Sequence, residues 1–264
     1  MPIRPLAAIA AALVVHAGPV LAQRTGDQAR LIFTVSGAYL DRKALWSVSS
    51  QPVPDVGGGT GVDNFALSRG IMRTFGAGFS GTYFAGEHVG ISADAFLIGL
   101  GFEDNCRIEG NLQSAQNGEI CDFIDQRERR AAAVTVSAGG LFRINSRDPI
   151  SPFARVNAGL LFSNQSAIRT EGFTNQGVLL TIYDDDSDTR VSPSFGLGIG
   201  VTFALARAYH LRFEVRDNIV GVQEVTGATP GPRVIPPHKE KFQQLFSLLV
   251  GLDVILERDR GRRY

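Results

Sequence analysis

The sequence predicts an all-β fold, an eight-stranded antiparallel up-and-down β-barrel that spans a membrane. Eight segments of about ten residues or more alternate apolar and polar side chains with a period of two, as strands do and helices do not. The connections between them are alternately short and long, and the polar faces carry mostly small residues. Strands of this length exceed those usual in soluble sheets and match the length that crosses a bilayer at a tilt.

In the first half of the chain, the second segment shows the alternation over its whole length. From residue 71 to residue 84, one parity includes Ile71 and Phe75, and the other consists mostly of Gly, Ser and Thr. The third segment is apolar on both parities from Phe96 onward, so we expect a bulge or a filled barrel end there. The first four expected strands are Leu31–Leu40, Ile71–Phe84, Val89–Phe102 and Ala131–Ile144.

In the second half, the sixth segment is the most regular. Every second residue from Val191 to Phe203 is apolar, and the residues between them are Gly, Ser and Thr. The seventh alternates apolar residues with charged ones, Leu211 and Phe213 against Arg212 and Glu214. The other four expected strands are Phe153–Gln165, Val191–Phe203, His210–Ile219 and Phe242–Leu256.

The connections indicate which end of the barrel is which. Outer-membrane barrels carry tight periplasmic turns at one end and long external loops at the other. We therefore expect short periplasmic turns, four long external loops, and both ends of the barrel segment at the short-turn end. The expected turns are 85–88, 145–150 and 204–209, and the expected loops are 41–68, 103–128, 168–189 and 221–240.

The composition of the two faces favours a membrane barrel over two soluble alternatives. A soluble sandwich exposes a charged face, yet no Lys occurs between residues 44 and 238. A lipocalin-like barrel would place its apolar face inside. Here the polar parity is mostly Gly, Ser, Thr and Ala, which fit the narrow interior of eight strands.

The N-terminus predicts export. Arg4 precedes an apolar stretch too short to span a bilayer, and small residues follow it, so we expect a signal peptide, 1–22, cut between Ala22 and Gln23. The predicted organisation then continues with a periplasmic segment, 23–29, the barrel, 30–256, and a charged C-terminal tail, 257–264. We expect the protein in the outer membrane. The chain has 26 basic and 26 acidic residues, a balance that argues against nucleic-acid binding.

The two cysteines, Cys106 and Cys121, lie in one polar stretch. In an exported protein such a pair predicts a disulfide. Closing a ring of this size would stabilise the fold by roughly 3 kcal/mol. A metal site would need further ligands, and no His or third Cys lies nearby, so we expect no metal ion and no cofactor.

Charged residues on the polar parity are expected to face the lumen. A charge sealed in a narrow lumen must be paired and hydrogen-bonded. The set is either a salt-bridged plug that fixes strand register or the lining of a gated ion path, and we favour the plug because eight strands enclose no open channel. The predicted luminal charge network is Asp94, Arg143, Arg155, Arg212, Glu214, Arg216 and Asp253.

Other motifs are weaker candidates for chemistry. The acidic run 184–188 has oxygen ligands for loose calcium binding but lacks the pattern of an EF-hand, so we favour a solvated loop tip. His88, His210 and His238 are interpreted as ordinary solvated histidines, and we expect no catalytic residue. The alternating glycines of 196–200 lie inside a strand with no helix after them, which argues against a nucleotide loop.

The pattern resembles the OmpA/OmpX-like family of small outer-membrane β-barrels. The most similar segments are 75–79, 152–159 and 195–200, together with a final strand in which Gly251 precedes Val254 and Leu256. The chain departs from the family by continuing past that strand and by having Leu249 where a polar residue is usual.

The resemblance implies a structural or surface-interaction role through the external loops. A narrow ion-conducting porin is the alternative, and a lipid-modifying enzyme is less favoured. The implied partners are outer-membrane lipid and lipopolysaccharide, the outer-membrane assembly machinery and an external ligand that the sequence does not name. We expect a monomer.

Overall fold

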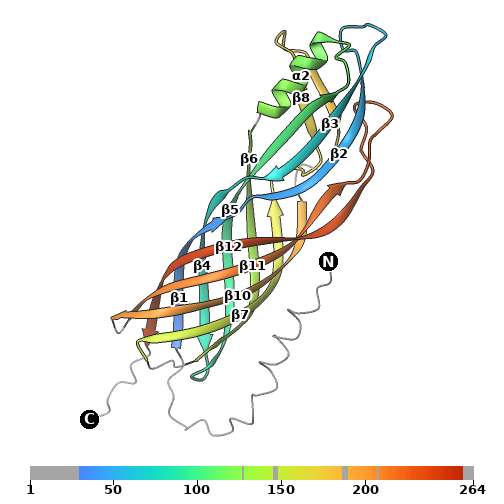
Figure 1. Ribbon diagram of the computed structural model, residues 1–264. Coiled ribbons are helices and arrows are strands. Elements are labelled where there is room, and N and C mark those ends of the chain that lie inside the picture. Colours follow the sequence, from blue (N-terminus) through green and yellow to red (C-terminus); the bar gives the residue numbers. More distant parts are fainter. Residues whose placement is uncertain (1–29, 127, 145–147, 186–189, 207, 258–264) are drawn as a thin grey trace, which may run out of the picture.

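The main sheet of the computed structural model closes into a barrel (Figure 1). The structure describes residues 30–126, 128–144, 148–185, 190–206 and 208–257. The predicted signal peptide, its cleavage site between Ala22 and Gln23, the segment 23–29 and residues 258–264 of the predicted tail lie outside this part of the chain. The elements are β1 (Arg30–Leu40), β2 (Lys43–Pro54), β3 (Val62–Ile71), β4 (Thr74–Phe84), β5 (Val89–Glu109), α2 (Ala115–Gln126), β6 (Glu128–Arg143), β7 (Ile150–Ser163), β8 (Thr170–Phe173), β9 (Leu179–Tyr183), β10 (Arg190–Ala206), β11 (Tyr209–Val225) and β12 (His238–Glu257).

Eight antiparallel strands surround the lumen, as predicted. The sheet order is β2-β3-β5-β4-β1-β12-β11-β10-β7-β6, and pairing of β5 with β6 closes it. The elements β1 and β2 are successive parts of one long strand, broken at 41–42, and β3 and β4 are parts of another, broken at 72–73. The backbone of Arg30 pairs with Glu257 and with Phe84, so both ends of the barrel segment lie at the short-turn end.

The outer surface of the barrel carries an apolar belt. Phe75 is 77% exposed, Ile91 71% and Ile199 67%. Exposure of such large apolar side chains is unfavourable in water and favourable in lipid. On the final strand, Phe246, Leu248 and other alternate residues continue the belt. This arrangement confirms the predicted direction of the two faces.

The prediction is wrong for one residue that was expected on the outer face. Ile71 lies inside, at 2% exposure, although Phe75 of the same predicted strand faces outward. The cause is the break between β3 and β4, which interrupts the alternation that the sequence shows as continuous. The double apolar parity after Phe96 corresponds to a filled interior, because Phe96 and Ile98 are buried while Leu97 is exposed, and the pairing of β5 with β6 has no bulge.

The four predicted long loops contain much more regular structure than expected. Residues 41–68 hold β2 and most of β3, residues 103–128 hold the end of β5 and α2, residues 168–189 hold β8 and β9, and residues 221–240 extend β11 and β12. Alternation is weak in β2 because its pairing with β3 shifts register after Ala44 and again after Val48. Each bulge moves later side chains to the other face, which hides a strand from a period-two search.

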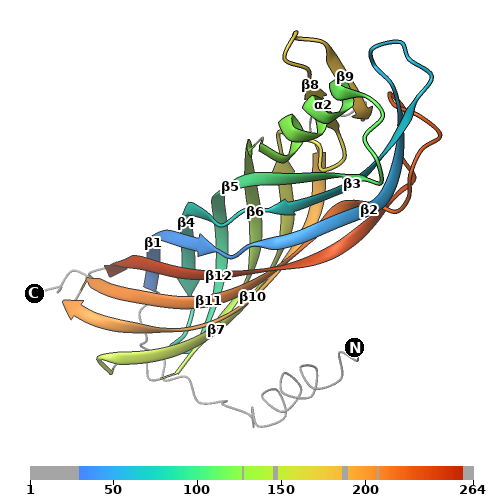
Figure 2. The same ribbon diagram turned by 45° about the horizontal axis from the view of Figure 1, so that its top comes forward.

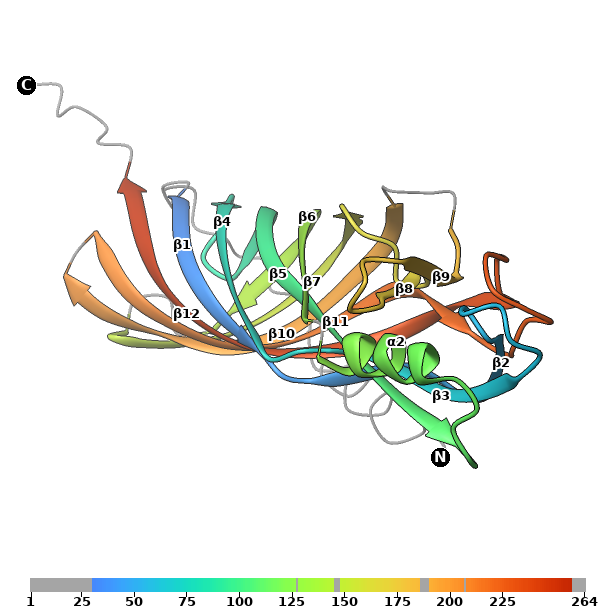
Figure 3. The same ribbon diagram turned by 90° about the horizontal axis from the view of Figure 1, so that it is seen from above.

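These elements form one ordered region beyond the barrel, which we call the extension: β2, β3, the end of β5, α2, β8, β9 and the adjoining ends of β11 and β12. Figures 2 and 3 show α2 lying beside the β8–β9 hairpin, and α2 also contacts the end of β5. In the extension many large apolar side chains point inward, and Phe65, Ile120 and Ile182 are fully buried. The extension therefore has an apolar interior, unlike the spanning part of the barrel, whose interior holds the charged residues.

The pairing of β6 with β7 predicts a sensitive glycine. A Cβ on Gly139 would overlap the carbonyl oxygen of Val156 on the neighbouring backbone, whereas a Cβ on Gly140 would meet nothing within 4 Å. We expect Gly139→Ala to lower the free energy of unfolding by about 1–3 kcal/mol, because the strands must separate. Urea titration of the lipid-reconstituted protein measures it, with Gly140→Ala as the matched control, and equal midpoints would contradict the prediction.

Candidate functional site

The membrane-spanning part of the lumen holds a compact group of charges. We call it the luminal cluster, and its members come from β5, β7, β11 and β12, each at most 7% exposed. It has three arginines and three carboxylates, so its formal charge is balanced. The members are Asp94, Arg155, Arg212, Glu214, Arg216 and Asp253.

Glu214 is the centre of the luminal cluster. Its carboxylate accepts from Arg212 Nη2 at 2.9 Å and from Arg216 Nε at 2.7 Å, and Arg155 Nη1 lies 3.5 Å away. Arg155 also donates to Asp94, and Arg212 Nη1 lies 3.9 Å from Asp253. The period of two explains the geometry, since residues 212, 214 and 216 of one strand must share the inner face.

Arg143, the seventh residue of the predicted network, lies nearer the short turns. Its Nε donates to the carbonyl of Glu87 at 2.7 Å, and its guanidinium carbon lies 3.8 Å from the centre of the Phe84 ring. Phe84 belongs to an apolar group that fills this end of the lumen. The members of that group are Ile32, Phe84, Leu141, Phe153 and Ile255.

Little free space remains in the spanning part of the lumen. A cavity lined by five residues of the luminal cluster, all except Asp253, has a volume of about 10 Å³, and another, nearer the short turns, has about 20 Å³. The smaller volume is at the lower limit for a single water molecule. The ion-paired side chains of the luminal cluster therefore leave little free space at this level of the lumen.

Sequence reasoning missed three polar or small residues that complete the luminal cluster. Thr34 Oγ1 donates to Asp253 at 2.6 Å, and Asn157 Nδ2 donates to Asp94 at 2.8 Å. Gly198 pairs with both Arg155 and Arg216, and a Cβ there would meet the Glu214 carboxylate and the Arg155 side chain. The alternation predicted that these residues face the lumen, but it did not predict which charged side chain each one contacts.

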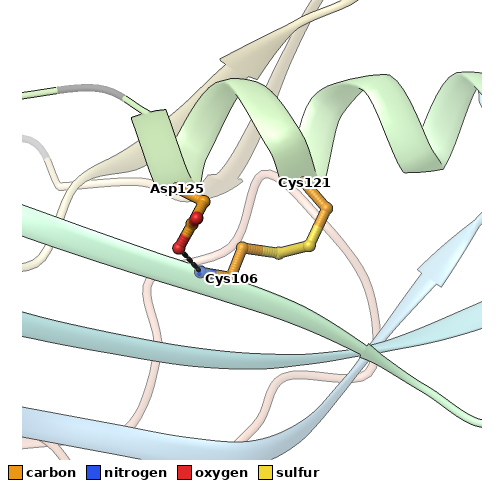
Figure 4. Close-up of a disulfide and its surroundings, with 3 residues drawn as sticks. All are labelled: Cys106, Cys121 and Asp125. Carbon is orange, nitrogen blue, oxygen red and sulfur yellow. Dashed lines mark hydrogen bonds between the residues drawn. A yellow bond between two sulfur atoms is a disulfide. The ribbon is translucent and has the colours of Figure 1, made fainter.

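The disulfide between Cys106 and Cys121 is present, which confirms that prediction (Figure 4). It joins the end of β5 to α2, with the two Cα atoms 5.3 Å apart. The amide of Cys106 also donates to Asp125 Oδ1 at 3.4 Å. The cross-link therefore fixes α2 against the strand that runs into the barrel.

A buried arginine that the sequence placed beside a loop organises the extension. Arg69 is 1% exposed, forms an ion pair with Asp104 and donates to the carbonyl of Arg169 at 2.9 Å. Its guanidinium carbon lies 5.4 Å from the centre of the Trp46 ring. These contacts connect β3, β5 and the chain before β8.

Two aspartates connect the β2–β3 hairpin to the start of α2. Asp63 accepts from the amides of Gln113 at 2.7 Å and Ser114 at 3.1 Å. Asp55 accepts from the Ser114 hydroxyl and from the amides of Gly57 and Gly59, and these bonds hold the pKa of Asp55 below its ordinary value. The hairpin tip and α2 therefore form one ordered surface.

The acidic run differs from a solvated loop tip at Asp185. This residue is 8% exposed, and its carboxylate accepts from Arg190 Nη2 at 2.7 and 2.8 Å. Residues 186–189 lie outside the described part of the chain, so calcium binding by the run stays untested. No group of three or more His, Cys, Asp or Glu residues suited to a metal ion occurs among the described residues.

His88 and His210 lie toward the short-turn end, and His238 lies at the opposite end of the fold. His88 Nδ1 lies 3.0 Å from the carbonyl of Arg143, near the short turns, and His238 Nδ1 lies 2.9 Å from the carbonyl of Pro236, in the extension. His210 lines the small cavity nearer the short turns. Within the described part of the chain, no helix is both long enough and apolar enough to cross a membrane.

Comparison with known proteins gives a family match. A family model described as "Outer membrane protein beta-barrel domain" matches residues 8–229. Comparison with curated proteins finds no match.

Several solved structures of small outer-membrane proteins are similar. Ail of Yersinia pestis is 14% identical with a TM-score of 0.41, covering 87% of this chain and 100% of that one. Neisserial surface protein A is 12% identical with a TM-score of 0.41, covering 86% and 97%. OprG of Pseudomonas aeruginosa is 10% identical with a TM-score of 0.42, covering 88% and 97%. At these values the likeness supports no statement about function.

Proposed function

Since the chain belongs to the outer membrane protein beta-barrel domain family, we propose that it is a surface-interaction barrel whose extension contacts partners outside the cell. The observation that carries the proposal is the contrast between the two halves. The lumen holds little free space at the luminal cluster, while the extension is an ordered region held by a disulfide. Proteins place binding residues on loops held by a rigid scaffold, and the extension has that form.

The closed lumen is tested by electrical recording. We expect the wild-type protein in planar lipid bilayers to show no steady openings, because the space among the luminal charges is about 10 Å³. The comparison variants are Arg155→Ala and Arg216→Ala. A steady wild-type conductance that either variant abolishes would contradict the proposal and support a narrow porin.

The surface role is tested with a variant whose extension tips are shortened. Residues 55–61 and 226–237 connect strands of the extension, so short Gly-Ser linkers can replace them without removing a strand. Cells that produce this variant should attach to matrix-coated surfaces less than cells that produce the wild type. The control carries Ser and Gly substitutions in the turn 85–88, at the opposite end.

Folding of each variant is checked by the difference in gel migration between heated and unheated samples. Equal attachment by cells with the wild type, the shortened variant and no barrel would overturn the surface role.

A further inference from the structure

A cavity of about 330 Å³ lies where the barrel meets the extension, above the closed part of the lumen. Residues of β3, β5, β7, β10, β11 and β12 line it. The lining includes residues that face the lumen, such as Leu161 at 5% exposure, and residues that face outward, such as Val191 at 59%. The cavity therefore reaches from the interior to the wall of the barrel.

In the barrel wall beside this cavity, the hydrogen-bonded pairing of β10 with β11 is incomplete. Pairing between β10 and β11 ends at Ser194 and Val220, although β10 continues back to Arg190 and β11 continues to Val225. Beyond that point β10 pairs only with β7, and β11 only with β12, among the described residues. Pro193 stands at the end of the ladder and has no backbone N–H to donate.

The inner part of the cavity is apolar. Ile71, Phe102, Leu161, Val220 and Leu245 line it, and each is 5% exposed or less. The volume lies at the lower end of the range for small-molecule sites, and an engineered apolar cavity of about 150 Å³ binds benzene. The space therefore fits one ring with a short chain.

The outer lining of the cavity includes two side chains, Arg190 and Gln223, that each have an unpaired buried polar atom in the described part of the chain. Arg190 Nε and Gln223 Oε1 are both buried atoms with no hydrogen-bond partner among the described residues. Buried polar atoms are normally paired, and a rotation of either side chain toward the cavity would let a bound ligand satisfy its atom. The charge of Arg190 is already compensated by Asp185 at 2.7 Å, and Glu240 also lines the cavity.

We propose that this cavity binds an uncharged amphiphile whose apolar body lies among the inner residues and whose hydroxyl end meets Arg190 and Gln223. A hydroxyl both accepts and donates, which matches Arg190 Nε and Gln223 Oε1. A carboxylate head is disfavoured because Arg190 is paired with Asp185 and Glu240 adds negative charge. This site is separate from the surface role of the extension.

Three probes share a hexylphenyl group and differ only in the polar end: 4-hexylphenol has a hydroxyl, hexylbenzene has no polar group, and 4-hexylbenzoate has a carboxylate. Their binding is measured by saturation-transfer NMR on the full barrel in lipid nanodiscs, with empty nanodiscs subtracted to remove partition into lipid. We expect 4-hexylphenol to bind most tightly. Hexylbenzene should bind about two- to tenfold more weakly, since it makes no hydrogen bond.

The location is tested with a matched pair of neighbouring residues. Leu161→Trp should weaken 4-hexylphenol binding by at least about tenfold because it fills the cavity. Leu160→Trp is the control, since Leu160 faces outward at 46% exposure. Gln223→Leu should reduce the preference for 4-hexylphenol over hexylbenzene while leaving hexylbenzene binding unchanged.

A second filling variant keeps the test valid if Leu161→Trp does not fold. Ser192 lines the cavity from β10 and is partly exposed, so Ser192→Phe narrows the site without disturbing the inner residues. The proposal is overturned if neither folded filling variant weakens 4-hexylphenol binding. It is also overturned if hexylbenzene or 4-hexylbenzoate binds as tightly as 4-hexylphenol to the wild type.

Discussion

Glu214→Gln is expected to lower the free energy of unfolding by about 3–5 kcal/mol, the largest effect that we predict for one substitution. The side chain of Glu214 is 1% exposed and contacts Arg212, Arg216 and Arg155. Glutamine keeps the shape but removes the charge, so the luminal cluster changes from balanced to one net positive charge. In a space without bulk water, the arginines would repel one another with little screening.

The matched control is Glu224→Gln on the same strand. Glu224 forms ion pairs with Lys239 and Lys241, whose side chains are 64% and 47% exposed. Exposed pairs contribute about 0–1 kcal/mol, so this variant should stay close to the wild type. Guanidinium titrations of both variants in lipid, followed by gel migration, measure the difference. Equal losses would show that Glu214 is not the centre of a buried network.

Removing the disulfide is expected to destabilise α2 by about 3 kcal/mol while the barrel stays folded. Cys106 and Cys121 are 15 residues apart in sequence, and the chain-entropy account gives this value for such a ring. The relevant variant replaces both cysteines with serine. Amide hydrogen exchange should become faster in residues 115–126 and remain unchanged in β10 and β12.

The matched control for that experiment is Ser49→Ala on β2, an exposed position of the extension. It should leave exchange in α2 unchanged. Faster exchange throughout the barrel strands of the double-serine variant would contradict a local role for the cross-link. Unchanged exchange in α2 would show that its packing alone, through Ile120 and Ile124, is sufficient.

The barrel was predictable because one physical requirement governs every strand. Lipid outside and a narrow lumen inside force a period of two, and this period located the eight strands and the three turns. The extension obeys a different requirement. Its outer face meets water and its strands contain bulges, so the apolar face of β2 is buried and the simple alternation that marked the barrel is lost.

The luminal charges followed from the same parity, but their contacts did not. Sequence alone placed Glu214 between two arginines, and the structure adds Arg155 from a strand that is not next to it in the sheet. Contacts across a lumen depend on how strands tilt and stagger, which one sequence does not report. The ion pair of Arg69 with Asp104 was missed because the sequence placed Asp104 in a loop.

The two strand breaks also affect how this chain tolerates changes in length. An extra residue in an uninterrupted strand turns every later side chain to the opposite face, and β5 runs without a break for 21 residues. At 41–42 and 72–73 the alternation is already reset, so an inserted residue there can be absorbed before the next strand begins. Variation in length along this lineage should therefore accumulate at these junctions and at the tips, and be rare within β5.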